Sequence, residues 1–257
     1  MRIKKLLALA LAGTMVFSMA ACSGNKDGKS GSGSSEVTAK TVLEAFEEYQ
    51  DGEKFCFSYD MIMDMKFSAA GMEFVSSSVQ ATKEGKGVKY IKETSKSNFM
   101  GELEESVSET YTITKEDGTV IEASKDVEDD EWDVTPILST DEDDKNKYDI
   151  EEMEKTAKIE NDGDMYYVTS TITAEQMGIA EDDMMAGLED SEIEIVIAYD
   201  GKAGELKSID INMDKKLIET VFSALLGEVE VTEFTMKIEN IEKLDGEIEI
   251  PAEIELD

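Results

Sequence analysis

The sequence contains no histidine, the commonest general base and the commonest zinc ligand in proteins. It also lacks a Gly-x-Ser-x-Gly elbow, a Walker A loop and a Cys-x-x-Cys pair, and a serine or cysteine nucleophile would have no imidazole to activate it. A glycosidase needs only two carboxylates, but nothing in the sequence singles out such a pair among 60 acidic residues. We therefore expect a protein that is not an enzyme and that uses no cofactor.

Basic residues are scarce, with 25 Lys and Arg against 60 Asp and Glu and a net charge of −35. Nucleic acid is excluded as a partner, because its binding depends on Lys and Arg that displace counterions from phosphates. Docking to anionic lipid headgroups by charge is disfavoured for the same reason. The negative field is typical of a solvated acidic surface, and it favours divalent cations or a basic protein as partners.

Two acidic segments are candidates for cation binding, residues 126–131 and 141–144. The second begins like an EF-hand loop, but Lys145 occupies the third ligand position and Asn146 stands where the loop requires glycine. The EF-hand pattern therefore fails, and we predict no metal ligands. By default we interpret both segments as acidic stretches that are exposed to solvent. The alternative is a less regular cation site in either of them.

The only long apolar run lies near the N-terminus, over residues 6–17, after Arg2, Lys4 and Lys5. A basic head, an apolar middle and small residues before Cys22 predict a signal peptide over residues 1–21, and the run is shorter than the roughly 20 residues of a membrane-spanning helix. The residues before Cys22 resemble a bacterial lipobox. The resemblance implies cleavage before Cys22 and a lipid on its sulfur that anchors the protein to the outer face of the cell membrane. Ordinary secretion, with Cys22 an incidental thiol, is the alternative.

Residues 22–35 continue as glycine, serine and charged residues without one large apolar side chain, which predicts a flexible tether. Residues 36–257 contain no second linker of this kind and predict a single domain, which we expect to be monomeric. After removal of the leader, 22 basic residues face 60 acidic ones, a net charge of −38. Cys56 is the only other cysteine, so no disulfide framework is expected; we interpret it as a structural, half-buried thiol.

The strongest structural signal is the strict alternation of apolar residues with small or polar residues over positions 55–67. Side chains of a strand alternate between its two faces, so this segment predicts one strand of roughly 40 Å with an apolar face and a polar face. The apolar face carries Phe55, Phe57, Tyr59, Met61, Met63, Met65 and Phe67. A face of this length must be covered by helices or by a ligand.

The remaining segments predict helices and further strands in a regular order. Helical spacing of apolar residues predicts helices over 36–49, which includes Phe46, and over 215–226, with Asp214 and Gly227 as caps. In the segments that turn residues separate, apolar and polar residues alternate. This pattern predicts strands over 72–83, 88–94, 103–114, 119–124, 156–161, 164–172, 193–199, 205–213 and 229–240. Residues 126–154 predict an irregular excursion that is partly helical near its end, residues 174–188 a short helix, and residues 246–254 an edge strand stopped by Pro251.

This order of elements resembles the LolA/LppX-like lipoprotein superfamily. The likeness is carried by the leader ending in Cys22, residues 55–67, the hairpin at Asp162-Gly163, the strand pair at Asp200-Gly201 and the ending Ile248-Glu-Ile-Pro-Ala. It implies an α+β fold, in which a long, strongly curved antiparallel sheet, an open half-barrel of about 9–11 strands, wraps around two or three helices. Studied members hold acyl chains or lipids between sheet and helices. Because this chain keeps its anchor, we expect a tethered binder rather than a shuttle.

Methionine suits a cavity for acyl chains because its thioether is flexible and polarizable, and the chain has 15 methionines. The candidate ligand-binding residues are Phe55, Phe57, Tyr59, Met61, Met63, Met65 and Phe67 of the strand, with Phe46, Val221, Phe222 and Leu225 of the helices. Two functions stay open. One is a membrane-anchored protein that binds a lipid or another apolar ligand between sheet and helices. The other is a non-enzymatic envelope interaction protein with a filled core and an acidic surface for cations or a basic protein partner.

Overall fold

The computed structural model describes residues 37–50, 54–69, 71–99, 102–115, 117–137, 148–176, 187–188, 190–226 and 228–254. The predicted signal peptide, Cys22 and the tether lie outside these residues. So do the acidic segment 141–144 and residues 177–186 of the predicted helix 174–188. None of the helices within the described ranges is long and apolar enough to cross a membrane.

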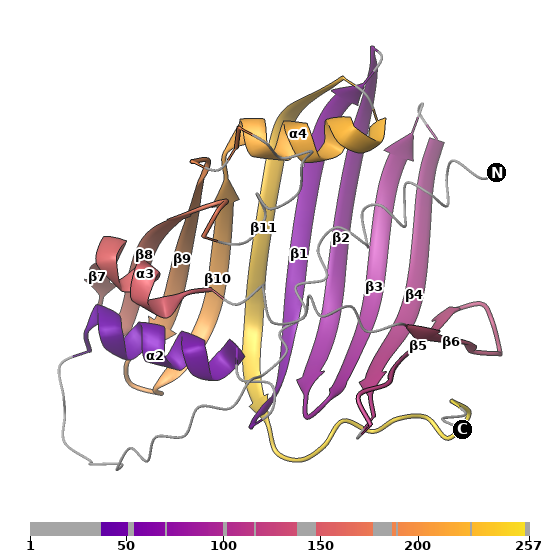
Figure 1. The fold of residues 1–257 in the computed structure, drawn as a ribbon, viewed down its shortest axis with the longest axis horizontal. Coiled ribbons are helices and arrows are strands. Elements are labelled where there is room, and N and C mark those ends of the chain that lie inside the picture. The colour runs from indigo at the N-terminus through magenta and orange to yellow at the C-terminus, as the bar shows by residue number, and fades with distance from the viewer. Residues whose placement is uncertain are drawn as a thin grey trace.

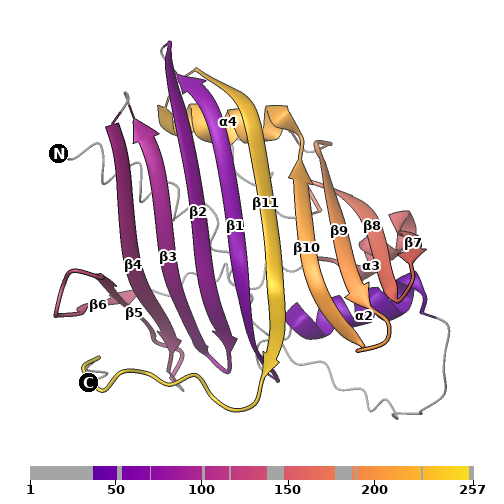
Figure 2. The ribbon, with the colours of Figure 1, turned by 180° about the vertical axis from the view of Figure 1, so that it is seen from behind.

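The described part of the chain forms one open antiparallel sheet of 11 strands, in the order β6-β5-β4-β3-β2-β1-β11-β10-β9-β8-β7 (Figures 1 and 2). The strands are Cys56–Ala69 (β1), Met72–Gly85 (β2), Val88–Phe99 (β3), Glu102–Thr114 (β4), Val120–Asp126 (β5), Asp133–Ile137 (β6), Lys158–Asp162 (β7), Met165–Thr173 (β8), Glu192–Asp200 (β9), Glu205–Met213 (β10) and Val229–Leu244 (β11). The first and last strands in sequence are therefore neighbours in the middle of the sheet.

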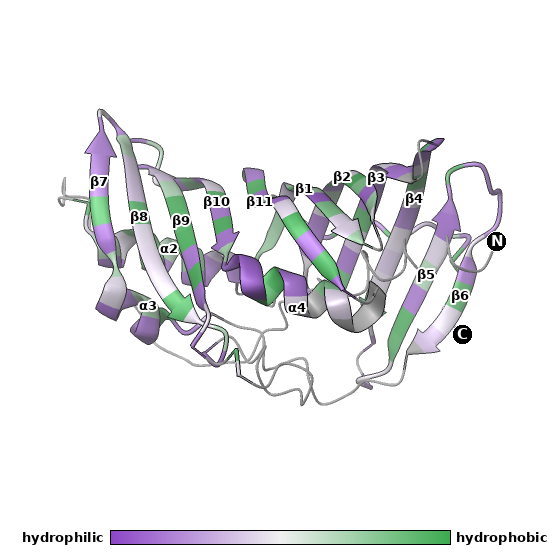
Figure 3. Ribbon diagram, turned by 90° about the horizontal axis from the view of Figure 1, so that it is seen from above, coloured by the Kyte–Doolittle hydropathy of each residue, from purple (hydrophilic) through white to green (hydrophobic). Residues whose placement is uncertain are grey.

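Three helices accompany the sheet in the described residues: α2 (Ala39–Gln50), α3 (Ile150–Thr156) and α4 (Lys215–Leu226). All three lie on the inner side of the bent sheet, α2 and α3 beside β8 to β10 and α4 across β11 and β1 (Figures 1 and 3). The prediction of a curved antiparallel sheet with a few helices is confirmed.

Two bulges in β11 distort the central pair of strands. The pairing of β1 with β11 shifts between Ser58 and Asp60 and again between Lys66 and Phe67, so that β11 carries one extra residue at each place. At the first bulge Asn240 adopts a φ of 55°, and its side-chain amide donates a 2.8 Å hydrogen bond to Asp60 Oδ2. A bulge increases local twist and bends the strand, which accounts for part of the curvature in Figure 3.

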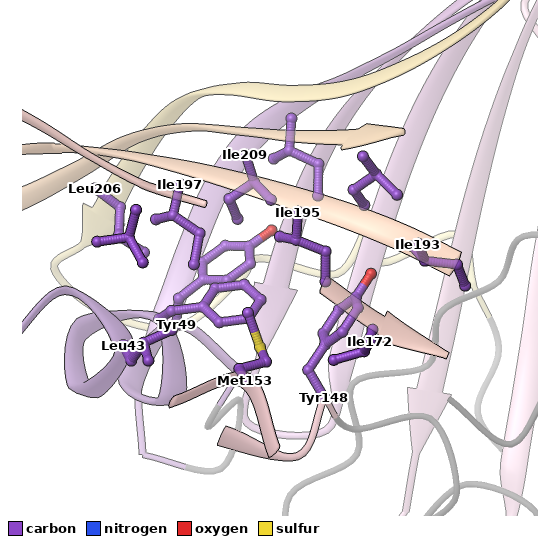
Figure 4. Close-up of a cluster of buried hydrophobic side chains, with 14 of the residues drawn as sticks. Leu43, Tyr49, Tyr148, Met153, Ile172, Ile193, Ile195, Ile197, Leu206 and Ile209 are labelled. Atoms are coloured by element: carbon purple, nitrogen blue, oxygen red, sulfur yellow. The ribbon is translucent and has the colours of Figure 1, made fainter. Parts of the chain in front are cut away.

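In the described part of the chain the apolar core is divided among three clusters. The largest fills the space between β8 to β11 and the helices α2 and α3 (Figure 4). A second lies under α4 at the far end of β1, around Met65, Phe67 and Phe222. The third lies on the opposite, outer face of β4 and β5, where Ile254 of the C-terminal segment packs against Tyr111 and its neighbours.

Three predictions about local structure were wrong. The excursion 126–154 contains a strand, β6, at the edge of the sheet, where Pro136 is tolerated. Residues 246–254 form no strand; their isoleucines alternate because one side of the segment packs on the outer cluster. Cys56 is 2% exposed rather than half-buried, because Gly85 of β2 allows the two backbones to come close.

Candidate ligand-binding face

The odd-numbered side chains of β1 share the inner face of the sheet, as predicted. Met65 and Phe67 are each 2% exposed. Phe57, Tyr59 and Met63 are also buried, whereas Phe55 and Met61 are partly buried. Alternation with period two therefore directs the whole apolar row away from solvent.

Helix α2 covers the start of this row. Its apolar residues recur every three or four positions, which places Phe46 and Tyr49 on the side that faces the sheet. The Tyr49 ring meets the rings of Phe57 and Tyr59 edge-on, with centroids 5.4 and 5.6 Å away. Phe46 packs on Tyr148, two residues before the start of α3, at 5.4 Å (Figure 4 shows Tyr49 and Tyr148). This end of the face is a filled aromatic core.

Helix α4 covers the other end of the row. Asp214 caps the helix, because its Oδ1 accepts a 2.7 Å hydrogen bond from the Lys216 backbone N–H. Phe222 stacks on Phe67 at 6.0 Å, and Phe67 stacks on Phe74 of β2 at 4.8 Å. The predicted site residues Val221 and Leu225 belong to α4, but the positions of their side chains lie outside what the structure describes.

The middle of the row lies between the two helical covers. Met63 is 6% exposed, yet among the described residues it joins neither the cluster under α2 and α3 nor the cluster under α4. Its neighbours across the strands are Met236 of β11 on one side and Ser78 of β2 on the other. Met61, one pair along, lies between Ile238 and Gln80. The centre of the face is therefore apolar toward β11 and polar toward β2.

A partly buried ion pair borders the apolar row. The Tyr59 hydroxyl donates a 2.8 Å hydrogen bond to Glu84 Oε2 of β2, and Lys89 Nζ of β3 lies 3.4 Å from the same oxygen. Burial, with the nearby Glu84 charge second, raises the pKa of Tyr59 well above its ordinary value. Tyr59 therefore acts as a neutral hydrogen-bond donor that holds the Glu84 carboxylate.

Phe55, the first predicted residue of the row, lies just before β1. Lys243 of β11 places its Nζ 3.4 Å from the centroid of the Phe55 ring and also forms an ion pair with Glu48 of α2. The ring contacts Phe57 edge-on at 6.4 Å. Lys243 therefore ties the helix to the sheet, and Phe55 lies at the start of the row rather than at its centre.

Sequence reasoning missed the contribution of α3 and the polarity of β2. Met153 of α3 is fully buried in the largest cluster, although the acidic residues around it hide its periodicity. In β2 the run Ser76-Ser77-Ser78 interrupts the apolar alternation, and this was the available signal that the face changes character there. Which strand lies beside β1, and in which register, could not be read from that run alone.

No group of three or more acidic or cysteine side chains in the described ranges is arranged to hold a metal ion. Those ranges include the acidic segment 126–131, which is exposed. The other proposed cation segment, 141–144, lies outside the described residues.

Neither a scan against models of known protein families nor a search of curated proteins found a match for this chain. The likeness to LolA/LppX-like lipoproteins therefore stays a prediction, because it rests on the order of elements and not on a shared sequence. What that likeness implies about function belongs to the proposal that follows.

Proposed function

We propose that this protein is a membrane-anchored, extracytoplasmic lipoprotein that binds a lipid or another apolar ligand between the inner face of its sheet and its helices. In this proposal the sheet acts as a LolA/LppX-like half-barrel around the helices, and Cys22 carries the lipid anchor. The protein is a monomeric binder without catalytic chemistry.

The observation that supports the proposal is the division of the inner apolar face of β1. Its two ends are covered by separate helices, and Met63 between them belongs to neither packed cluster of described residues, while Met236 belongs to the cluster under α2 and α3 and Met61 packs against it. Methionine side chains adapt to ligands of irregular shape, since their thioethers are unbranched and polarizable. Met61, Met63 and Met236 would form the centre of the ligand surface, and the aromatic clusters would form its two ends.

One observation favours the alternative, an envelope interaction protein with a filled core. Under α2 and α3, Phe46 and Leu43 are each 1% exposed and the aromatic rings interlock. If the remaining face is equally well packed, the acidic surface becomes the functional feature, with cations or a basic protein as partners.

Mass spectrometry of organic extracts from protein purified out of its native host tests the proposal. Wild type should release a non-covalently bound apolar molecule, and Met63→Asp should stay folded but lose it, because a carboxylate on this face is incompatible with an acyl chain. Ile62→Asp, on the outer face of the same strand, is the matched control and should keep the ligand.

The outcomes separate the two functions when stability is measured alongside. Wild type that releases no apolar molecule would contradict the proposal, as would folded Met63→Asp that still retains one. Unfolding of Met63→Asp with Ile62→Asp intact would identify a solidly packed core and support the interaction protein instead.

A further inference from the structure

Beyond β1 the inner face of the sheet becomes polar. The register pairs Met65, Met63, Met61 and Tyr59 of β1 with Ser76, Ser78, Gln80 and Thr82 of β2, so these eight side chains share one face. Three of the polar ones are buried: Ser78 at 6%, Gln80 at 7% and Thr82 at 3% exposed. The boundary between an apolar and a hydrogen-bonding surface thus runs along the β1–β2 pair.

The polar surface continues over the next two strands. Ser95 of β3 lies opposite Ser78 and also opposite Ser106 of β4, and the hydroxyls of Ser95 and Ser106 are 2.7 Å apart. Glu93 lies opposite Gln80, whose side-chain amide donates to Glu93 Oε2 at 3.4 Å. Hydroxyl groups can donate and accept in turn, so this surface suits a partner that carries several hydroxyls.

One of these groups has no partner within the described structure. The Ser78 Oγ is buried and makes no hydrogen bond there. Buried polar groups are almost always hydrogen-bonded, since an unmade bond carries the full cost of desolvation. Its position beside Met63 makes it the natural contact for a polar group attached to an apolar chain.

The charges on this surface select among polar groups. On the inner face of β2 to β5 the register places one lysine, Lys89, which pairs with Glu84. The acidic residues on the same face are Glu84, Glu93, Glu102, Glu104, Glu122 and Asp126. Burial also raises the pKa of Glu93, because its surroundings disfavour the charged carboxylate. A phosphate would be repelled, whereas a neutral hydroxylated group would not.

We infer that the ligand is an amphiphile with an uncharged, hydroxyl-rich head, such as a diacylglycerol that carries a sugar, with its chains along Met61, Met63 and Met236 and its head on Ser78, Gln80 and Ser95. This inference rests on the proposed binding function and specifies the class of ligand. It predicts that the protein binds a lipid with a glycosylated head group in preference to a lipid with an anionic head group and to a lipid without a polar head group.

The test offers the full-length protein equal amounts of three lipids with the same acyl chains: a diglucosyl diacylglycerol, phosphatidylglycerol and a triacylglycerol, in mixed micelles. The lipids retained after gel filtration are then quantified by mass spectrometry. Wild type should enrich the glycolipid about tenfold over the other two.

Ser78→Ala should lower that enrichment about threefold to tenfold by removing one hydrogen bond to the head group. The variant removes a buried hydroxyl without a partner, so folding is not at risk. Ser77→Ala, on the outer face of the same strand, is the control and should behave as wild type.

Each outcome has a distinct meaning. Retention of no lipid at all would overturn the proposed function itself. Retention of phosphatidylglycerol or triacylglycerol at least as well as the glycolipid would overturn only the head-group assignment. An unchanged enrichment in Ser78→Ala would do the same.

Discussion

Glu93 is a carboxylic acid whose surroundings disfavour its charge. Burial raises its pKa above the ordinary value of 4.5, and the hydrogen bond from Gln80 offsets this only in part. Between 4.5 and the raised value the folded protein holds a proton that the unfolded chain has released, so the free energy of unfolding falls as pH rises through that window.

Glu93→Gln removes this titration. We expect the variant to gain stability relative to wild type as pH rises from 4 to 7, as measured by urea unfolding at both values. Glu160→Gln, at an exposed position of β7, controls for the loss of one negative charge from an acidic chain. If the difference in the free energy of unfolding between Glu93→Gln and wild type is the same at both pH values, the titration of Glu93 does not contribute to stability.

At Gly85 the backbone of β2 lies close to the backbone at the start of β1. A Cβ at this position would lie 2.3 Å from the Phe55 carbonyl oxygen and 2.7 Å from the Cys56 Cα, and φ is +148°. Because both obstacles are backbone atoms at the start of β1, Gly85→Ala should cost about 3 kcal/mol or more in urea unfolding.

Gly118→Ala provides the comparison for that substitution. Gly118 also has a positive φ, +83°, but nothing lies within 4 Å of the added Cβ. The left-handed backbone alone should cost about 1–2 kcal/mol. Equal losses in the free energy of unfolding for the two variants would show that the close contact with Phe55 and Cys56 adds nothing to the cost of the Gly85 substitution.

At the scale of the element, an aromatic stack contributes to holding α4 on the sheet. Phe222 is 2% exposed and stacks on Phe67, which stacks in turn on Phe74. Phe222→Ala should lower the free energy of unfolding by about 3–5 kcal/mol, through lost burial and the cavity that remains. Lys216→Ala, exposed on the same helix, should change it by less than about 0.5 kcal/mol. A similar small loss in Phe222→Ala would mean that α4 is not docked through this ring.

The helices and long strands were predictable because each repeats its own period over many residues. Residues 55–67 and 215–226 gave nearly the bounds of β1 and α4, and the hairpin at Asp162-Gly163 joins β7 and β8 as expected. Strand β6 was missed because it is five residues long and contains Pro136, which a strand accepts only at an edge.

The candidate site was predictable only on its apolar side. The alternation in β1 identified Met61 and Met63 without any knowledge of the fold. The polar side is assembled from Ser78, Ser95 and Ser106, which belong to three strands and meet only through the register of β2, β3 and β4. A one-residue shift in pairing would turn every one of these side chains to the other face, so no single segment encodes the surface.

For the whole molecule, the outer face of the sheet has a cover of its own at the β5–β6 end. The segment after β11 ends beside these strands (Figures 1 and 2), where Ile254 is 4% exposed and the Tyr111 hydroxyl donates a 3.3 Å hydrogen bond to the Glu249 carbonyl. Trp132 meets the Tyr111 ring edge-on at 5.4 Å. The C-terminal residues thus stabilise the far edge of the sheet, on the face opposite to α2, α3 and α4.

Trp132 is the only tryptophan in the chain, so its fluorescence reports on this cover alone. Deletion of residues 247–257 should shift its emission to longer wavelength, since the outer cluster becomes exposed to water, while the inner clusters under α2 and α4 persist. Ile254→Ala should produce part of the shift and cost about 2–4 kcal/mol, and exposed Glu253→Ala should produce neither effect. Unchanged Trp132 emission in the deletion variant would show that the outer cluster does not depend on the C-terminal segment. A complete loss of fold would show instead that the two faces of the sheet are not independently stabilised.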